Sequence, residues 1–299
     1  MAFFTAIANR KGGVGKSTIT VMLAHALAVW GGKRVLILDL DSQCNTSLIL
    51  LGGQGWNDAR KAERTIADYF FDLFDGNAPK PKDYVVHAAG DVATANGKPP
   101  VISILPGSLL LEDVQGELYL RQAKESRDPD VVANRVRGRI EMLLRKFEGS
   151  FDVVLLDCPP GLSFAALAAL KIADRVLVPF RPDYVSELAV DRISLIIEDK
   201  RNQDELDALP MESRRYVCLA NYVRDNGRDR MLIEEIGLKH PVLDTRLPMR
   251  DGIANAFDFV GGSRQTIEAK YGNAIGDLRR LYDEIAPLLT DEDTKIAAQ

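Results

Sequence analysis

A glycine-rich segment near the amino terminus constrains the fold more than any other feature of the chain. Residues 3–9 form an apolar run of strand length, and residues 11–18, KGGVGKST, follow it directly. Residues 16–30 then form a helical stretch that Gly31 and Gly32 stop. Backbone N–H groups of such a loop can turn inward beside the amino end of the next helix, which attracts anions. The order strand, loop and helix therefore predicts a phosphate-binding βα unit.

Apolar runs of strand length alternate with helical periodicity along the rest of the chain. Several runs, such as RVLIL and VVLLD, are continuously apolar, which is typical of strands covered on both faces. The pattern predicts an α/β fold with a doubly wound, mainly parallel sheet. The expected strands are residues 3–9, 34–39, 101–105, 151–157, 175–179 and 216–221.

The domain organisation follows from the same pattern. We expect residues 1–289 to form one domain and residues 290–299 to be a frayed tail. Residues 52–97 mix glycines, prolines and charges, which predicts an irregular insertion with one amphipathic helix at 65–74. This insertion is either a solvated elaboration of the surface or a partner-binding site. Further helices are expected at 128–148 and 271–285.

Composition narrows the class of protein. With 46% hydrophobic residues and a net charge of −5 over 299 residues, the chain resembles ordinary globular proteins and not a globally basic nucleic-acid binder. It has no apolar run of about 18 residues and no basic region ahead of its first apolar stretch. The three cysteines, Cys44, Cys158 and Cys218, lie far apart, so we expect no disulfide framework and a reducing cytoplasm.

The glycine-rich segment matches most of the P-loop pattern G-x-x-x-x-G-K-[ST], although Arg10 stands at the opening glycine position. Glycines lack a Cβ, which lets the backbone approach phosphate oxygens closely. Lys16 is expected to reach the β- and γ-phosphates, and Ser17 to ligate Mg²⁺. We therefore predict a P-loop NTPase fold in which Mg²⁺ and ATP are bound by Lys11, Gly12, Gly13, Val14, Gly15, Lys16, Ser17 and Thr18.

Carboxylates follow two of the predicted strands. Asp39 and Asp41 come after VLIL, and Asp157 ends FDVVLLD. The carboxyl ends of parallel strands face the ligand crevice of an open α/β sheet. Asp157 is predicted to hold Mg²⁺ through its water shell, because magnesium dehydrates reluctantly. Asp41 either faces the nucleotide or caps the next helix, and we expect Asp39 to be structural.

Together these segments resemble the ParA/MinD superfamily of partition and positioning ATPases. KGGVGKST resembles the family's deviant Walker A motif, DLDSQCN its D-x-D-P-Q-x-N segment with Ser42 in place of proline, and DCPPG its D-x-P-P segment. The resemblance implies that Lys11 crosses a dimer interface to touch the partner's nucleotide and that Asp41 positions the attacking water. Lys11, Lys16 and Asp41 are thus the expected catalytic residues.

Two segments nearer the carboxyl terminus extend the resemblance. VPFRPDYVSE is similar to the family's strand after Walker B. Asn221 in VCLANYVRD stands where the family's asparagine hydrogen-bonds adenine. TRLPM resembles the segment that packs on the base, which implies a contact from Pro248.

The partition branch is the one that the chain resembles. It implies a homodimer that forms on ATP binding, coats double-stranded DNA non-specifically on the nucleoid, and is released when a ParB-like adaptor stimulates slow hydrolysis to ADP and phosphate. DNA binding would require Lys or Arg side chains that neutralise phosphates. The candidate residues are Arg224, Arg228, Arg230 and Arg250. A charged surface that simply faces water would explain this group of arginines about as well.

Other functions of the same fold stay open to different degrees. An ATPase that positions a protein cargo would use the same cycle. A MinD-like membrane-positioning ATPase is disfavoured, because the last predicted helix ends before Pro287 and acidic residues follow it. A metal-cluster reductase would need paired cysteines at a dimer axis, and neither Cys44 nor Cys158 fits that role.

Overall fold

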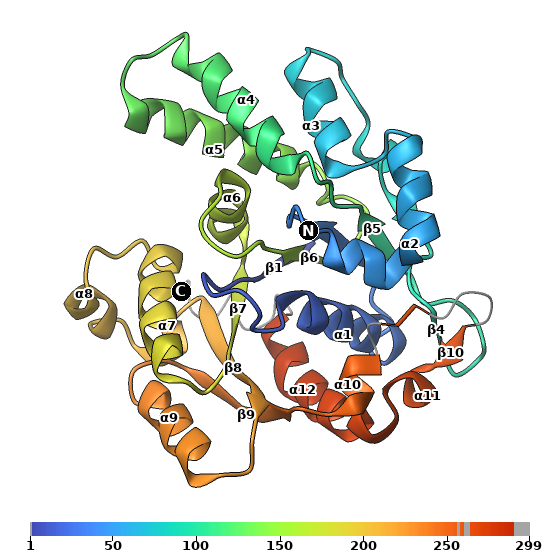
Figure 1. The fold of residues 1–299 in the computed structure, drawn as a ribbon, viewed down its shortest axis with the longest axis vertical. Helices are drawn as coiled ribbons and strands as arrows, with labels where there is room; N and C mark the ends of the chain where they lie inside the picture. Colours follow the sequence, from blue (N-terminus) through green and yellow to red (C-terminus); the bar gives the residue numbers. More distant parts are fainter. Residues whose placement is uncertain (1, 256–257, 260–263, 290–299) are drawn as a thin grey trace.

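The computed structural model describes residues 2–255, 258–259 and 264–289, so the predicted tail at 290–299 lies outside the described residues. Within the described part, eight strands form one sheet in the order β3-β5-β2-β6-β1-β7-β8-β9 (Figure 1). Neighbouring strands are parallel except β3, which runs antiparallel to β5. The strands are β1 Phe3–Ile7, β2 Val35–Asp39, β3 Val86–His87, β5 Ile102–Leu105, β6 Val153–Asp157, β7 Arg175–Phe180, β8 Tyr216–Val223 and β9 Val242–Pro248.

Helices connect these strands and cover both faces of the sheet (Figure 1). Local capping explains several of their starts: Thr65 and Asp68 form a capping box before α3, and the Asp128 carboxylate accepts from two backbone N–H groups at the start of α5. The helices are α1 Lys16–Val29, α2 Asn45–Lys61, α3 Ile66–Phe74, α4 Leu111–Ala123, α5 Pro129–Arg145, α6 Phe164–Ile172, α7 Tyr184–Ile197, α8 Gln203–Asp207, α9 Gly227–Gly237, α10 Asp251–Asn255, α11 Ile267–Tyr271 and α12 Ile275–Ile285.

The core is divided between the two faces of the sheet. In β2, Leu36 and Leu38 pack in one apolar cluster with residues of α3 to α7, whereas Val35 and Ile37 pack in the other with residues of α1, α11 and α12. This two-sided burial is the reason that the strands are continuously apolar instead of alternating. The doubly wound, mainly parallel α/β fold predicted from the sequence is confirmed.

Two stretches differ from the sequence prediction, and each lies next to a glycine with positive φ. Residues 53–61, expected to be irregular, belong to α2, which changes direction at Gly52 (φ 68°, ψ 170°) and then continues. The helix predicted at 271–285 begins later, at Ile275, because Gly272 takes φ 47° and ends the preceding helix α11 at Tyr271. The glycines at 52, 53 and 55 were the reason that 53–61 was expected to be irregular, yet Gly52 only changes the direction of the helix.

None of the helices in the described residues combines the length and apolarity that crossing a bilayer requires.

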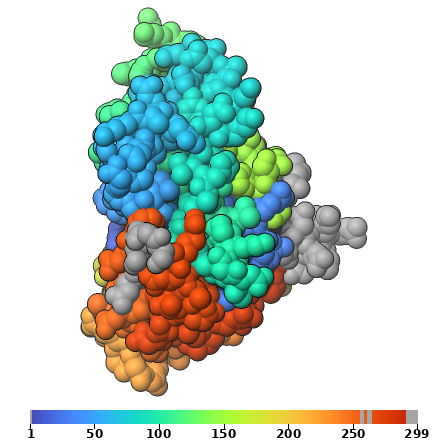
Figure 2. All heavy atoms as spheres, turned by 90° about the vertical axis from the view of Figure 1, so that its right-hand side faces the viewer, coloured from blue at the N-terminus to red at the C-terminus, as the bar shows by residue number. Residues whose placement is uncertain are grey.

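A second, two-stranded sheet joins the region of residues 85–100 to the carboxyl-terminal helices. Its strands, β4 (Val92–Ala93) and β10 (Gln265–Thr266), are parallel, and Figure 2 shows the two regions in contact on one face of the molecule. Beside them, Lys270 Nζ lies 2.6 Å from Asp91 Oδ2, and both side chains are buried. A folded protein is strongly destabilised when one partner of a buried ion pair is removed, because the other charge is left buried and unpaired. This pair therefore fixes where the excursion between β2 and β5 meets α11.

His25 of α1 lies next to this contact and is wholly buried. Its Nδ1 is hydrogen-bonded to the Tyr271 hydroxyl at 2.9 Å, and its Nε2 has no hydrogen-bond partner among the described residues. Burial, aided by the positive charge of Lys270, lowers the pKa of His25 to about 3. The imidazole is thus neutral in the folded protein at physiological pH.

The pKa of His25 predicts a loss of stability in acid. An unfolded histidine has a pKa of about 6.5, so below that pH the unfolded chain binds a proton that the folded protein excludes. At pH 5 this single group should lower the free energy of unfolding by about 2 kcal/mol relative to pH 7. We expect His25→Gln to remove that part of the pH dependence, measured by denaturant unfolding at both pH values. An unchanged difference between pH 7 and pH 5 would contradict the assignment.

Candidate functional site

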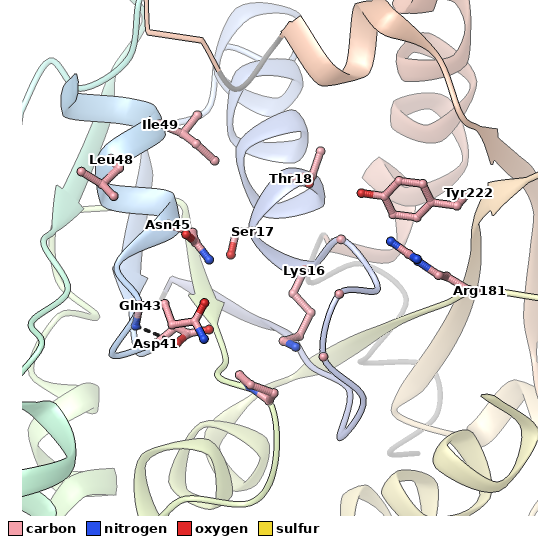
Figure 3. Close-up of a pocket in the computed structure, with 14 residues that line it drawn as sticks. Lys16, Ser17, Thr18, Asp41, Gln43, Asn45, Leu48, Ile49, Arg181 and Tyr222 are labelled. Carbon is pink, nitrogen blue, oxygen red and sulfur yellow. Dashed lines mark hydrogen bonds between the residues drawn. The ribbon is translucent and has the colours of Figure 1, made fainter. Parts of the chain in front are cut away.

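The loop between β1 and α1 lines a cavity of about 500 Å³ at the carboxyl edge of the sheet (Figure 3). Gly13 and Gly15 take φ values of 68° and 92°, which residues with a Cβ rarely adopt. A Cβ on Gly15 would also lie only 2.3 Å from Asn221 Nδ2. Glycine at position 15 is therefore required both by the backbone conformation and by the close neighbour.

Asn221, near the end of β8, ties this loop to the sheet. Its Nδ2 donates to the Val14 carbonyl oxygen at 2.8 Å, and its Oδ1 accepts from the Tyr222 backbone N–H at 2.9 Å. One amide N–H of the residue predicted to contact adenine thus holds the phosphate loop. Pro248, also predicted at the base, ends β9, and its neighbour Met249 lines an adjoining second cavity of about 600 Å³.

Lys16 lies at the start of α1 and is almost completely buried. Its Nζ is 3.4 Å from the Lys11 carbonyl oxygen, and the residue lines the cavity. Burial lowers the pKa of the Lys16 ammonium group, although the nearby Asp157 and Asp41 carboxylates act in the opposite direction. A buried ammonium group facing an open cavity is suited to bind an anion that replaces its lost hydration.

Asp157, at the end of β6, lies at the floor of the site and is wholly buried. Hydroxyl groups surround its carboxylate: Thr46 Oγ1 donates at 2.5 Å, Thr20 Oγ1 at 3.2 Å, and Ser17 is a further hydrogen-bond partner. Burial raises the pKa of Asp157, while the hydroxyl hydrogen bonds oppose the rise. The structure thus brings together the two predicted magnesium ligands, Ser17 and Asp157. One carboxylate and one hydroxyl beside a phosphate cradle fit Mg²⁺, which prefers oxygen ligands and takes several of them from water and substrate.

Asp41 lines the cavity, whereas the Asp39 carboxylate is occupied by hydrogen bonds from Ser47. Asp41 Oδ1 accepts from the Gln43 backbone N–H at 2.9 Å, and burial raises the pKa of this carboxyl group. Asp41 does not cap α2, since Cys44 occupies the cap position with φ 56° and no side-chain hydrogen bond. Asp39 Oδ2 accepts from the Ser47 backbone N–H and hydroxyl at 2.9 and 2.6 Å, which fits the structural role expected for it.

Lys11 does not point toward the cavity of its own loop. Its Nζ forms an ion pair with Asp183 and lies 3.4 Å from Ser186 Oγ. Asp183 is also the N-cap of α7, because its Oδ1 accepts from the Ser186 backbone N–H at 3.0 Å. Burial by itself raises the pKa of Asp183, but the hydrogen bonds from Lys11 and Ser186 outweigh it and hold the pKa below its usual value.

The four arginines predicted to contact DNA are all exposed but fall into two groups. Arg230 is paired with Asp225, and Arg250 Nε lies 2.7 Å from Asp277 Oδ2. Arg224 and Arg228 line the second cavity, where the Arg228 guanidinium lies 5.1 Å from the centroid of the Tyr184 ring.

Four residues of this region were not singled out from the sequence. Thr46 binds the Asp157 carboxylate, Asp183 binds Lys11, and Arg181 and Tyr222 line the cavity beside the phosphate loop. Thr46 directly follows the DLDSQCN segment, Arg181 and Asp183 lie within VPFRPDYVSE, and Tyr222 lies within VCLANYVRD. Membership in these segments gave them no role, because each role depends on a contact between distant parts of the chain.

Comparisons with known proteins agree with this geometry. A family model described as an AAA domain matches residues 4–207. The chain is 30% identical over 231 residues to the chromosome partitioning protein ParA of Caulobacter vibrioides, with 77% of this chain and 74% of that protein covered. It is 28% identical over 184 residues to the sporulation initiation inhibitor protein Soj of Bacillus subtilis, with 62% of this chain and 60% of Soj covered.

Solved structures with lower identity share the fold. The cell division ATPase MinD of Pyrococcus furiosus superposes with a TM-score of 0.63 at 19% identity, covering 96% of this chain and 100% of that one. Apo McdA of Cyanothece gives a TM-score of 0.65 at 17% identity, covering 95% of this chain and 100% of that one. The family model, the ParA relative and the fold agree with the motifs found in the sequence, and the chain belongs to the ParA/MinD superfamily of P-loop ATPases.

Proposed function

We propose that this protein is a partition-type ATPase in which ATP binding pairs two copies of the chain, and the pair binds DNA without sequence preference. The observation that carries the proposal is that two lysines on one loop point in different directions. Lys16 is buried at the cavity, whereas Lys11 is held outside it by Asp183. A cation in that position is available to a second molecule. The relative named ParA, a chromosome partitioning protein, supports this reading.

The chemistry is hydrolysis of ATP to ADP and phosphate. Lys16 and the backbone N–H groups from Gly12 to Thr18 bind the phosphates, and Asp41 orients the attacking water. Ser17 and Asp157 would hold Mg²⁺, which would neutralise charge on the β- and γ-phosphates. Asp41 is suited to its role because it lines the cavity with one carboxylate oxygen held by Gln43. The intrinsic rate is slow, and a ParB-like adaptor raises it.

Pairing brings Lys11 of each copy to the nucleotide of the other. A triphosphate carries more negative charge than the Asp183 carboxylate, so it attracts the Lys11 ammonium group away from its resting partner. Tyr184, Val185 and Leu188 in the first turns of α7 are each more than half exposed beside this ion pair. Exposed apolar side chains clustered next to a charged site are typical of an interaction surface. The dimer interface therefore includes the start of α7.

DNA binding in this proposal depends chiefly on Arg224 and Arg228. Arg230 and Arg250 form ion pairs with neighbouring carboxylates. These ion pairs would have to break before either arginine could neutralise a DNA phosphate. Because the net charge of the chain is −5, the protein as a whole does not attract DNA, and any attraction must come from local basic groups such as these. The protein acts in the cytoplasm, on the nucleoid, with residues 1–289 as one ATPase domain.

The proposal predicts an ATP-dependent dimer that requires Lys11. Asp41→Ala should bind ATP but hydrolyse it at least about 100-fold more slowly, because the water is no longer oriented. With ATP and Mg²⁺ this variant should double its mass in size-exclusion chromatography with light scattering and comigrate with duplex DNA. Lys11→Ala should stay monomeric under the same conditions. A monomeric Asp41→Ala variant, or a dimeric Lys11→Ala variant, would count against the proposal.

Removing the charge of Asp183 should favour the dimer. Asp183→Asn keeps a good helix cap for α7 but weakens the hold on Lys11. A partly exposed ion pair contributes about 0.2–1 kcal/mol, and two pairs break for each dimer, so the dimerisation constant with ATP should rise about 2- to 30-fold. Sedimentation in the hydrolysis-deficient Asp41→Ala background measures it. An unchanged or smaller constant would show that the ion pair does not compete with pairing.

DNA retention should depend on Arg228 more than on matched exposed arginines. Arg228→Glu should abolish retention at moderate salt, and the slope of log affinity against log salt should fall by about 0.9 for each phosphate that the variant no longer neutralises. Arg135→Glu on α5 makes the same charge change and serves as the control, since Arg135 is also exposed but lies on another helix, where it is paired with Glu125. Equal retention of both variants in a filter-binding assay with ATP would exclude this face.

A further inference from the structure

A groove of about 630 Å³ lies between α5 and α7, on a part of the surface that the nucleotide site does not use. Figure 1 shows α6 between these two helices, and residues of α6 line the groove together with theirs. None of the described residues that line the groove also lines the nucleotide cavity or the second cavity. A ligand in this groove would therefore leave both of those sites open.

Helix α5 turns one regular stripe of residues toward the groove. The lining residues of α5 are Asn134, Arg137, Gly138 and Glu141. They share one face, because residues three and four positions apart are neighbours on a helix. On the opposite side of α5, residues such as Val132 and Val136 are buried in the core. One face of α5 is thus packed inside the protein, and the other is open to the groove.

Gly138 stands in the middle of this stripe. Apart from its chain neighbours and the helix backbone, no described atom would lie within 4 Å of a Cβ added to Gly138. Its φ is not among the positive ones, so the fold itself does not require a glycine here. Glycine inside a helix lowers helix stability relative to alanine. The missing side chain leaves a place where the backbone of a second molecule can approach α5 closely.

Apolar side chains form the floor of the groove. Leu167 of α6 and Leu195 and Ile196 of α7 line it, and each is only partly buried. Leu195 and Ile196 pack against the core, and the rest of each side chain remains accessible along the groove. Covering this floor with a second molecule removes apolar area from water, which stabilises a complex.

Basic side chains outnumber acidic ones around this floor. The charged lining residues are Arg137, Lys171, Lys200 and Arg215 on one side of the balance and Glu141 and Asp199 on the other. None of these side chains forms an ion pair with another residue that the structure describes. The chain as a whole has a net charge of −5, so the positive excess in the groove is a local feature. It favours a ligand that carries carboxylates.

Arg215 is fixed where two helices end. Its Nη1 donates to the Ala173 carbonyl oxygen at 2.9 Å, and its Nη2 donates to the Ile197 carbonyl oxygen. Ala173 is the C-cap of α6, and Ile197 is the last residue of α7. Unpaired carbonyl groups give helix ends a partial negative charge, which would repel an acidic ligand. Arg215 compensates this charge, and its guanidinium group is already held in place before a ligand arrives.

We propose that this groove binds an acidic amphipathic helix of a partner protein. The apolar face of that helix covers the floor, its carboxylates meet the basic side chains, and its backbone approaches α5 at Gly138. Binding of a helix in a groove uses apolar anchors at helical spacing. DNA fits the groove less well, because a phosphate backbone has no apolar face and Glu141 and Asp199 would repel it. The inference goes beyond the proposed function, since neither ATP nor DNA takes part in this contact.

The test uses three designed peptides as probes. Each has about 14 residues, or about four helical turns, and the first carries leucines along one face and glutamates elsewhere. The second has lysines in place of the glutamates, and the third is a scrambled form of the first with no apolar face. Fluorescence anisotropy with the full chain, without nucleotide, should show that the acidic amphipathic peptide binds at least about 10-fold more tightly than either of the others.

A glycine substitution separates binding from folding. Gly138→Gln should raise the melting temperature, because glutamine favours a helix more than glycine does. Its side chain should also block the peptide and weaken binding about 5- to 150-fold, the range expected when a packed contact is overfilled. Gly116→Gln on α4 is the matched control, since Gly116 is exposed in a helix and an added Cβ would meet equally open space in the described structure. This control should raise the melting temperature and leave peptide binding unchanged.

Two double variants test the charges. Lys171→Ala combined with Lys200→Ala should weaken binding of the acidic peptide about 2- to 30-fold, as expected for the loss of two exposed ion pairs. Arg139→Ala combined with Lys146→Ala should leave binding unchanged, because both residues are exposed but do not line the groove.

Several results would overturn the proposal. They are equal affinity for the acidic and lysine peptides, equal effects of the two glycine variants, and equal effects of the two double variants. A loss of DNA retention in the Lys171 and Lys200 double variant as large as that in Arg228→Glu would instead make the groove a DNA surface. All peptide measurements are made without nucleotide, so they are independent of the ATP-dependent dimer.

Discussion

A buried cluster of opposite charges at the carboxyl edge of the sheet is the constraint on which the rest of the site depends. Lys16, Asp41 and Asp157 are all at most 7% exposed, and each belongs to a different segment of the chain. Charged groups taken out of water are costly unless other charges or hydrogen bonds replace the lost hydration. Here serine and threonine hydroxyls bind Asp157, while the pKa of Lys16 is lowered and the pKa values of both carboxyl groups are raised. A triphosphate with Mg²⁺ bound in this cavity would supply further partners for these charges.

The parallel sheet is what makes such a cluster possible. Strands β1, β2 and β6 are neighbours in register, with Ile7 beside Asp157 and Asp157 beside Asp39. Their carboxyl ends therefore meet at one edge of the sheet. Parallel pairing alone then brings together the polar residues that follow each apolar run. The helices on both faces exclude water from the strands but leave this edge open. Burial of the charges is thus a consequence of the same topology that makes the strands apolar.

The fold and the phosphate loop could be predicted from the sequence because their signals are local. Glycines at positions 13 and 15, continuous apolar strands and capped helices each act within a few residues. The contacts of Lys11 and Asn221 could not be predicted in this way. Asp183 lies 172 residues from Lys11, and Val14 lies 207 residues from Asn221. Which carboxylate meets a loop lysine depends on the packing of β7 and α7, and sequence spacing carries no information on that.

The same limit explains why Arg181 and Tyr222 escaped the motif analysis. An arginine after a strand and a tyrosine after an asparagine are common residues in common places. They become distinctive only when β7 and β8 pair in parallel and bring Phe180 beside Ala220, which sets the residues that follow at one edge. There a left-handed tyrosine, fixed by Asn221, meets a guanidinium group whose Nε–H is buried. Backbone strain of this kind persists only where the surroundings enforce it. Asn221 therefore couples two parts of the site, since one amide fixes both the phosphate loop and the ring beside it.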